Sequence, residues 1–211
     1  MHILSADIKF PPVSKANEYG MLAIGGDLSI ERLKLAYNSG IFPWYSEGEP
    51  IVWYSPLERM VLFPDELNVS KSMRKVLRDG GFEVTVNKAF DEVIRNCKYI
   101  SRKDEFGTWI TDEMQEAYID LNRLGMAKSI EVWQHKELVG GLYGVEVGTV
   151  FCGESMFSKV SNASKVAFIY LVQQHNYELI DCQIYNDHLA SLGAREIDRE
   201  EFMAHLNKGD F

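Results

Sequence analysis

The sequence has few cysteines and no pattern of metal-ligating side chains. Its three cysteines, Cys97, Cys152 and Cys182, are odd in number and widely spaced among 211 residues. This spacing argues against a disulfide framework and against a cysteine-rich zinc site. The five histidines show no ligand spacing, so we expect no metal. Such cysteine usage is typical of the reducing cytoplasm, where we place the protein.

The chain also lacks long apolar segments and an excess of positive charge. No run approaches the roughly 18 apolar residues of a membrane span, and the N-terminus has no signal-peptide pattern. We therefore expect a globular protein with no membrane partner. The formal net charge of −9 argues against a protein that coats nucleic acid through its overall charge.

One basic cluster contrasts with this acidic background. Lys71, Arg74, Lys75 and Arg78 fall within one predicted helix. A solvated helix face is the ordinary explanation of such a cluster. A local nucleic-acid contact is the alternative, and it needs independent support.

Proline is absent after residue 64. All six prolines precede residue 65, together with one helix predicted between Ser29 and Gly40. We expect a small, loop-rich N-terminal domain over residues 1–65 with little regular sheet. From residue 66 to residue 211, helical and strand patterns alternate, which predicts an α+β domain with a mixed central sheet.

The predicted elements of this second part follow from helix caps, hydrophobic periodicity and glycine stops. The expected helices cover 70–80, 90–97, 111–124, 162–175 and 187–192, and a last helix follows Asp198. The expected strands cover 82–86, 129–133, 138–145, 179–184 and the segment around Glu154. Short turns between the three strands from residue 129 predict antiparallel hairpins.

Glu154 is a lone carboxylate in an apolar strand. Its neighbours are Val150, Phe151, Cys152, Met156 and Phe157. Burial of an unpaired carboxylate is costly, so we expect Glu154 to be paired or to line a cleft where a ligand meets it. The helix that begins after Ser161 offers free backbone N–H groups close by, which suit an anionic ligand.

Asp181 and Gln183 place a second pair of polar groups in an apolar strand. Residues two apart in a strand share a face. The Asp181 carboxylate can then accept from the Gln183 amide and raise the electron density on its carbonyl oxygen, which suits an incoming amine. A buried structural network at a strand end is the alternative, and the residues alone leave both open.

Two tryptophans, Trp44 and Trp109, lie on predicted loops beside glycines. A tryptophan on a loop is usually a core residue. The alternative is a platform on which a nucleic-acid base stacks.

These segments together resemble the bacterial leucyl/phenylalanyl-tRNA–protein transferases. The resemblance extends from about Gly20 to Ala194 and rests on several motifs in one order. They are residues 20–29 (GMLAIGGDLS), 40–44 (GIFPW), 53–56 (WYSP), 107–111 (GTWIT), 153–158 (GESMFS), 162–165 (NASK), 179–183 (LIDCQ) and 191–194 (SLGA).

The resemblance implies a GNAT-like acyltransferase domain behind the small N-terminal domain. It implies an enzyme that moves Leu or Phe from aminoacyl-tRNA onto the α-amine of proteins that begin with Arg or Lys, which marks them for ATP-dependent degradation. No metal or nucleotide cofactor is implied. We expect the protein to act as a monomer.

The resemblance also implies roles for the residues above. Asp181 and Gln183 match a pair that relays a proton as the amine attacks the ester, with Asp181 polarising Gln183. Glu154 matches a pocket residue that can hold an ammonium group. The apolar pocket for the Leu or Phe side chain is expected at Leu142, Met156, Leu171 and Ile180. The tRNA is expected at Trp44 and Trp109, near the terminal adenosine, and at Lys71, Arg74, Lys75 and Arg78, near the acceptor stem.

Two other functions remain compatible with the residues. The first is a coenzyme A-dependent N-acetyltransferase on the same fold, although the segment between Glu154 and Lys165 lacks a glycine-rich pyrophosphate loop. The second is a non-catalytic module that binds tRNA or protein N-termini. In that case substitution of Asp181 and Gln183 would leave function intact.

Overall fold

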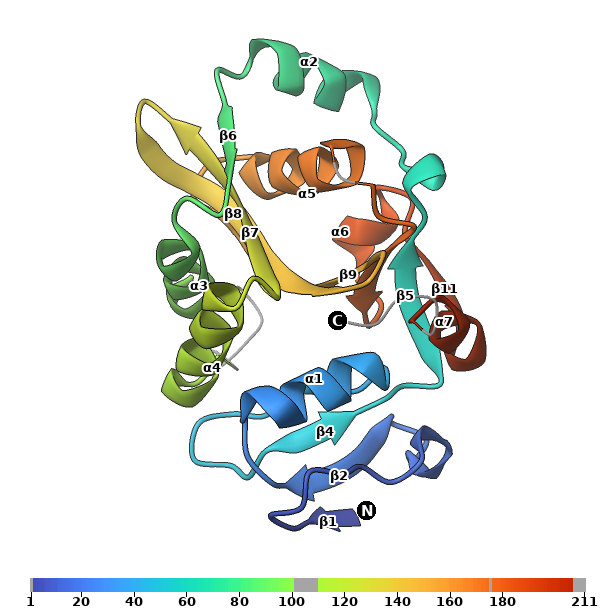
Figure 1. Ribbon diagram of the computed structural model, residues 1–211. Coiled ribbons are helices and arrows are strands. Elements are labelled where there is room, and N and C mark those ends of the chain that lie inside the picture. Colours follow the sequence, from blue (N-terminus) through green and yellow to red (C-terminus); the bar gives the residue numbers. More distant parts are fainter. Residues whose placement is uncertain (1, 101–109, 175, 207–211) are drawn as a thin grey trace.

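The computed structural model describes residues 2–100, 110–174 and 176–206, which are built around two β-sheets (Figure 1). None of the described helices combines the length and the apolar character needed to cross a membrane.

The first third of the chain forms the smaller sheet. Its four strands lie in the order β1-β2-β4-β3. Their bounds are β1 His2–Leu4, β2 Met21–Gly25, β3 Phe42–Pro43 and β4 Val52–Tyr54. The sheet is small, as expected of a loop-rich part of the chain. These strands have only two to five residues each, too few for an alternating pattern to identify them in the sequence.

Helix α1 (Ile30–Asn38) lies between the smaller sheet and the larger one (Figure 1). Ser29 occupies its N-cap position as predicted, but the Ser29 side chain makes no capping hydrogen bond. The helix buries Leu33, Ala36 and Tyr37. Tyr37 thereby reaches from the N-terminal part of the chain into the interior.

The larger sheet has seven strands in the order β11-β5-β10-β9-β8-β7-β6. Their bounds are β5 Glu58–Leu62, β6 Glu83–Val86, β7 Ala127–Gln134, β8 Glu137–Val147, β9 Val150–Ser158, β10 Leu179–Gln183 and β11 Arg195–Asp198. β9 and β10 are parallel, whereas the other neighbouring strands are antiparallel. The prediction of a mixed central sheet is confirmed.

Strands β5 and β11 are not evident from the sequence pattern. β5 begins with two charged residues, and β11 contains three in its four positions, so neither shows the apolar alternation of a half-buried strand. β5 lies before the expected boundary between residues 65 and 66, yet it pairs within the larger sheet. The division into 1–65 and 66–211 remains a prediction.

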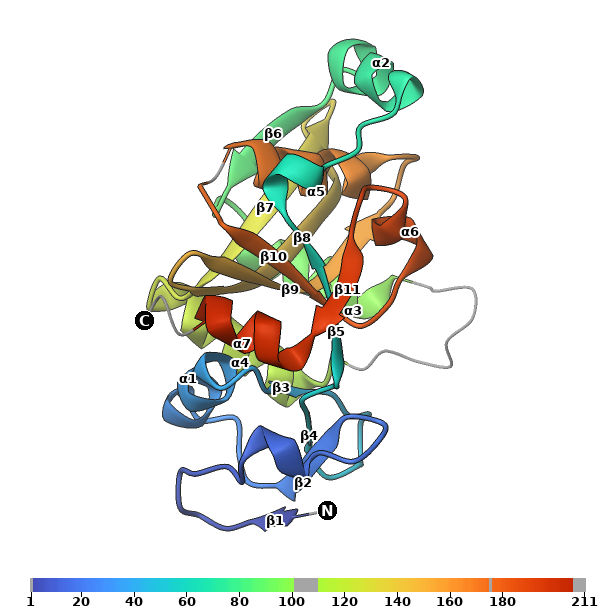
Figure 2. The ribbon, with the colours of Figure 1, turned by 90° about the vertical axis from the view of Figure 1, so that its right-hand side faces the viewer.

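Helices cover both faces of the larger sheet. α3 (Phe90–Tyr99) and α4 (Asp112–Arg123) contribute to the core on one face, and α5 (Ala163–Gln174) to the core on the other. The remaining helices are α2 (Lys71–Asp79), α6 (Asp187–Ala190) and α7 (Arg199–Leu206), with short 3-10 helices at Val13–Lys15 and Pro64–Glu66. Helix α2 lies at the end of the molecule opposite β1 (Figure 2).

Two predicted helix starts are confirmed by their hydrogen bonds. The Ser70 hydroxyl accepts from the backbone N–H of Met73 at 3.1 Å, and the Thr111 hydroxyl accepts from that of Met114 at 3.1 Å. Each bond satisfies one of the free N–H groups at a helix N-terminus. Helix α5 makes the crossover that a parallel β9–β10 pair requires, and this arrangement brings Glu154 on β9 close to Gln183 on β10.

Candidate active site

A cavity of about 640 Å³ opens beside strands β9 and β10 and helix α5. Eight residues singled out in the sequence line it together. They are Trp44, Leu142, Glu154, Met156, Leu171, Ile180, Asp181 and Gln183. Side chains from five different elements or loops thus converge on one space, as expected of a binding or active site.

One side of the cavity is apolar. Leu142 on β8, Leu171 on α5 and Ile180 on β10 are each at least 97% buried. Met156 on β9 pairs with Leu142 across the strands and is partly exposed. Such a lining suits a hydrocarbon or aromatic side chain, and methionine adapts to different shapes.

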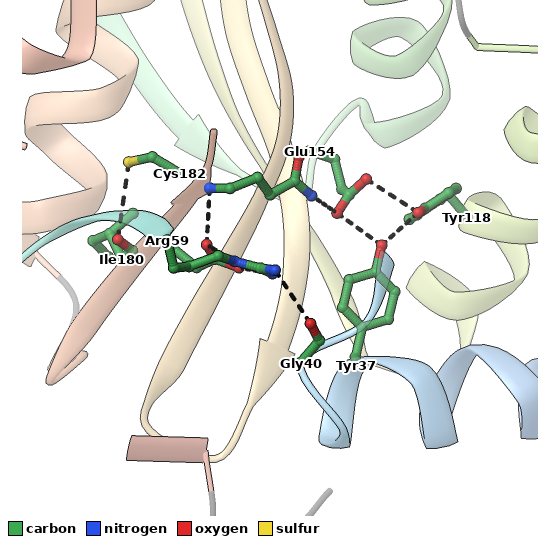
Figure 3. Close-up of polar contacts among 9 residues, drawn as sticks. Tyr37, Gly40, Arg59, Tyr118, Glu154, Ile180 and Cys182 are labelled. Carbon is green, nitrogen blue, oxygen red and sulfur yellow. Dashed lines mark hydrogen bonds and ion pairs between the residues drawn. The ribbon is translucent and has the colours of Figure 1, made fainter. Parts of the chain in front are cut away.

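Glu154 lies at the polar side of the cavity and is 8% exposed. The Tyr37 hydroxyl donates to Glu154 Oε1 at 2.7 Å, and the Gln183 side-chain amide donates to the same oxygen at 2.9 Å. The Tyr118 hydroxyl donates to Glu154 Oε2 at 3.1 Å. Glu154 is therefore paired and also lines a cavity, the two situations expected for it, and Figure 3 shows its hydrogen bonds.

Burial controls the ionisation of this cluster. It raises the pKa of Glu154 to about 8, against the hydrogen bonds from Tyr37 and Tyr118, which favour the charged form. The pKa values of both phenols lie well above their usual range because the rings are buried beside Glu154. Burial likewise raises the pKa of the nearby Cys152 thiol well above its usual value, so this thiol supplies no nucleophile at neutral pH.

Asp181 is fully buried and forms an ion pair that the sequence did not reveal. The Arg59 guanidinium, from β5, donates from Nε to Asp181 Oδ1 at 2.8 Å and from Nη2 to Oδ2 at 2.7 Å. Arg59 also donates to the backbone oxygen of Gly40 at 3.2 Å, and its guanidinium contacts the faces of the Phe42 and Phe202 rings. A bidentate contact of this kind fixes the carboxylate firmly.

Gln183 departs from regular strand geometry. The pairing of β10 with β5 shifts register between Asp181 and Gln183, and the Gln183 backbone has a φ of 65°. This left-handed conformation is uncommon for a residue with a side chain. The backbone N–H of Gln183 donates to Asp181 Oδ1 at 2.8 Å, which holds the residue in that conformation.

The predicted hydrogen bond from the Gln183 side-chain amide to the Asp181 carboxylate is not the one that the structure shows. Asp181 accepts from the Gln183 backbone instead, and the side-chain amide donates to Glu154. The register shift is the reason, because it removes Gln183 from the face that an unbroken strand would share with Asp181. Glu154 is thus the carboxyl group that orients the Gln183 amide.

The structure brings in three residues that sequence analysis missed: Arg59, Tyr37 and Tyr118. Tyr37 and Tyr118 are each at most 2% exposed. Both rings fit the apolar faces of their helices. Hydrophobic periodicity therefore accounts for the rings but does not indicate that the two hydroxyls contact Glu154. Arg59 directly precedes the apolar residues 60–62. A charged residue beside such a run indicates a buried and paired charge, as it does for Glu154.

The expected tRNA-contacting residues lie apart from one another. Trp44 lines the cavity and is 38% exposed, with its ring centroid 5.8 Å from that of Tyr54. Trp109 lies outside the described residues. The basic residues of α2, at positions 71, 74, 75 and 78, are all exposed, and they lie at the end of the molecule marked by α2 (Figure 2).

Within residues 2–100, 110–174 and 176–206, no group of three or more His, Cys, Asp or Glu side chains is placed to hold a metal ion. The cavity instead offers an apolar pocket beside an amide and a carboxyl group. This arrangement can hold an apolar side chain and direct a hydrogen-bond acceptor at an amine.

Comparison with solved structures supports the fold. The crystal structure of FemX matches with a TM-score of 0.52 and 10% identity, over 80% of this chain and 66% of that chain. A GCN5-related N-acetyltransferase from Kribbella flavida also resembles the chain, with a TM-score of 0.39 and 10% identity over 75% of this chain and 57% of that chain. The observed mixed sheet and the likeness to FemX agree with the α+β class predicted from the sequence.

Sequence comparison identifies the family. The leucyl/phenylalanyl-tRNA protein transferase family model matches residues 61–207, and the model of its N-terminal domain matches residues 26–57. A leucyl/phenylalanyl-tRNA–protein transferase of Flavobacterium johnsoniae is 65% identical over 98% of this chain and 99% of its own length. That of Flavobacterium psychrophilum is 59% identical over 99% of this chain and 100% of its own length. The chain therefore belongs to the leucyl/phenylalanyl-tRNA–protein transferases.

Proposed function

We propose that this enzyme transfers Leu or Phe from aminoacyl-tRNA to the α-amino group of proteins with N-terminal Arg or Lys, in the cytoplasm and as a monomer. Family membership supports the transfer from tRNA to protein. The observation that carries the proposal is a cavity in which an apolar wall adjoins the Gln183 amide and the Glu154 carboxyl group.

The apolar wall is the proposed site of the transferred side chain. Leu142, Met156, Leu171 and Ile180 form an uncharged lining on that side of the cavity. A Leu or Phe side chain gains roughly 1.5–3 kcal/mol when it is fully buried in such a place. The same lining offers no hydrogen-bond partner to a polar side chain. Binding of such a side chain would therefore be unfavourable, because it would lose its hydrogen bonds to water.

The reaction needs little chemical activation, because an aminoacyl ester is already reactive. The amine nitrogen forms a bond with the ester carbonyl carbon, the bond from that carbon to the terminal ribose oxygen breaks, and the proton lost by the nitrogen balances the one gained by that oxygen. Gln183 donates its amide N–H to Glu154, and its amide oxygen is the proposed acceptor of the amine N–H. Positioning of the two substrates supplies the main rate enhancement.

A second cavity, of about 910 Å³, supports a basic acceptor. It shares Ile184 and Tyr185 with the first, so the two spaces adjoin. Six exposed carboxylates line this acidic groove, at Glu18, Glu58, Glu196, Asp198, Glu200 and Glu201. Among the described residues that line it, the one cationic side chain is Arg199, which donates to the backbone oxygen of Ser55. An excess of negative charge beside the reactive pocket attracts a cationic polypeptide and repels the tRNA phosphates.

The tRNA is proposed to approach from the other side. The exposed cations of α2 are the candidates for the acceptor stem, and Trp44 at the cavity is the candidate for the terminal adenosine. Arg and Lys side chains bind phosphates without reading sequence, and an exposed tryptophan gives a base a surface on which to stack.

Transfer of labelled amino acids tests the proposal. Leu-tRNA and Phe-tRNA would each be offered with one peptide that begins with Arg and a matched peptide that begins with Ser. We expect label to enter only the Arg peptide. Equal labelling of both peptides would contradict the acceptor preference. No labelling by a folded protein that still binds charged tRNA would favour a non-catalytic binding module.

A further inference from the structure

Tyr37, Tyr118 and Glu154 form a closed ring of contacts at the polar side of the cavity (Figure 3). Tyr37 comes from α1, Tyr118 from α4 and Glu154 from β9. The two hydroxyls contact each other, the Tyr37 hydroxyl contacts Glu154 Oε1, and the Tyr118 hydroxyl contacts Glu154 Oε2. Three contacts therefore close the ring, and each needs one proton to be a hydrogen bond.

The number of protons decides the state of the carboxyl group. If Glu154 is ionised, the two phenols carry two protons, and when both donate to the carboxylate their own contact brings two oxygen lone pairs together. If Glu154 is protonated, three protons serve three contacts. The Tyr118 contact then has the opposite direction from that in the ionised state: the acid O–H on Oε2 donates to the Tyr118 hydroxyl, Tyr118 donates to Tyr37, and Tyr37 donates to Oε1. Each hydroxyl now donates once and accepts once.

The charged groups around the ring do not favour an ionised Glu154. The Arg59 guanidinium, on β5, acts on Glu154 but is already paired with Asp181 of β10. The Asp181 charge opposes ionisation, as does the burial of the carboxyl group, which raises the pKa of Glu154 to about 8. On β8, the uncharged ring of Tyr143 packs against that of Tyr118 with centroids 5.7 Å apart. On β9 itself, the buried Cys152 thiol is neutral.

We propose that Tyr37 and Tyr118 are positioning residues, which hold Glu154 as a neutral carboxylic acid so that its carbonyl oxygen fixes the Gln183 amide for aminoacyl transfer. The role in transfer rests on the function proposed above. Oε1 accepts from both Tyr37 and Gln183, as a carbonyl oxygen with two lone pairs can. With its amide nitrogen held by Glu154, Gln183 lines the cavity and keeps its amide oxygen for the substrate.

A neutral Glu154 changes the expected part of this residue in acceptor binding. An ionised carboxylate would stabilise the α-amine as an ammonium ion, which has no lone pair and cannot attack an ester. A neutral ring stabilises no cation, so it favours the uncharged, nucleophilic amine. The positive side chain of the acceptor is left to the acidic groove nearby.

Infrared difference spectroscopy tests the ring without any substrate. A protonated carboxyl group has a C=O stretch separate from that of a carboxylate. We expect such a band at pH 7 in the parent protein and its loss in Glu154→Gln. Glu131→Gln is the matched control, since Glu131 is also fully buried but accepts hydrogen bonds from Thr85, Ser129 and backbone N–H groups. A parent spectrum without a Glu154-dependent band at pH 7 would overturn the proposal.

Transfer kinetics test the positioning role. We expect Tyr37→Phe and Tyr118→Phe to lower kcat by about 10-fold or more, with KM for the peptide changed by less than about threefold, because orientation rather than binding is lost. Glu154→Gln should retain more turnover than Glu154→Ala, since the glutamine amide offers an N–H to Tyr118 and an oxygen to Gln183. Thermal melting confirms that each variant is folded.

Two kinetic outcomes would overturn the positioning role. One is an unchanged kcat in both phenylalanine variants, and the other is equal loss in Glu154→Gln and Glu154→Ala. Failure of the proposed function is distinguishable from these, because the parent protein would then transfer no label while its infrared band remained dependent on Glu154.

Discussion

Arg59 and Asp181 form a bidentate ion pair between β5 and β10, with the side chains 3% and 0% exposed. The same Asp181 accepts the backbone N–H of Gln183, whose φ is 65°. The ion pair therefore links Arg59 to the backbone conformation of Gln183, which lines the cavity. Asp181 acts on Gln183 through the backbone, as an anchor.

Breaking this pair should destabilise the protein strongly. Removal of one partner leaves the other charge buried and unpaired, which costs about 3–5 kcal/mol. We expect Arg59→Ala and Asp181→Ala each to lower the free energy of unfolding by that amount in urea titrations, and the double variant to lose less than the sum of both. Arg59→Lys should also destabilise, because an ammonium group cannot donate to both carboxylate oxygens in the same fork geometry. A loss below about 1 kcal/mol in both alanine variants would show that the pair is dispensable.

Stability should fall with rising pH through Glu154. Its pKa is about 8 in the folded protein against a usual value of 4.5, so below pH 4.5 both folded and unfolded states hold the proton. Between these values the unfolded state ionises first, and the free energy of unfolding falls by about 1.4 kcal/mol per pH unit. Above pH 8 the fall is complete.

Glu154→Gln removes this titration. We expect the variant to gain stability relative to the parent between pH 5 and pH 8, as measured by urea unfolding at each pH. A constant difference between the two proteins over this range would contradict the raised pKa.

Much of the site could be predicted because polar residues in apolar strands are unusual. Glu154, Asp181 and Gln183 stand out on that ground, and burial cost alone implies that each has a partner. Leu142 and Ile180 are expected from the family resemblance, and they lie on β8 and β10, the two strands that flank β9. The identity of the partners is a different matter, because it depends on which strands pair.

The missed residues show where sequence reasoning stops. Arg59 and Asp181 are 122 positions apart, and only the insertion of β5 beside β10 brings them together. Tyr37 and Tyr118 lie on the buried faces of α1 and α4, and hydrophobic periodicity does not show which group a buried hydroxyl contacts. The register shift before Gln183 is likewise a tertiary feature, and it explains the wrong hydrogen bond expected for Asp181.

Gln183 should matter for turnover more than for binding. We expect Gln183→Ala to lower kcat by about 100- to 10,000-fold if its amide oxygen accepts the amine proton, with little change in the Kd for charged tRNA. Gln134→Ala is a matched control, since the Gln134 amide donates to the backbone oxygen of Gly80 at 2.9 Å and does not line the cavity. Single-turnover transfer measures both. Turnover within about threefold of the parent would exclude the role of Gln183.

The basic face of α2 should contribute to tRNA binding through salt-sensitive interactions with phosphates. We expect Lys71→Ala combined with Arg74→Ala to weaken tRNA binding and to flatten the plot of log Kd against log salt by about 0.7–0.9 for each phosphate that is no longer neutralised. Lys9→Ala combined with Lys15→Ala is the control, because these cations are also exposed but lie before β2. An unchanged slope in the α2 variant would mean that these cations form a solvated helix face and do not contact the tRNA.

The acidic groove should set the affinity for basic acceptors without affecting the chemical step. Glu196→Gln combined with Glu200→Gln removes two of the six carboxylates that line it. Because these carboxylates lie beside the reactive cavity rather than in it, we expect KM for a peptide with N-terminal Arg to rise about 3- to 10-fold at low salt, with kcat retained and the difference reduced at high salt. Glu83→Gln combined with Glu137→Gln, two exposed positions on β6 and β8, controls for net charge. An equal rise in KM in both double variants would mean that overall charge, and not the groove, attracts the acceptor.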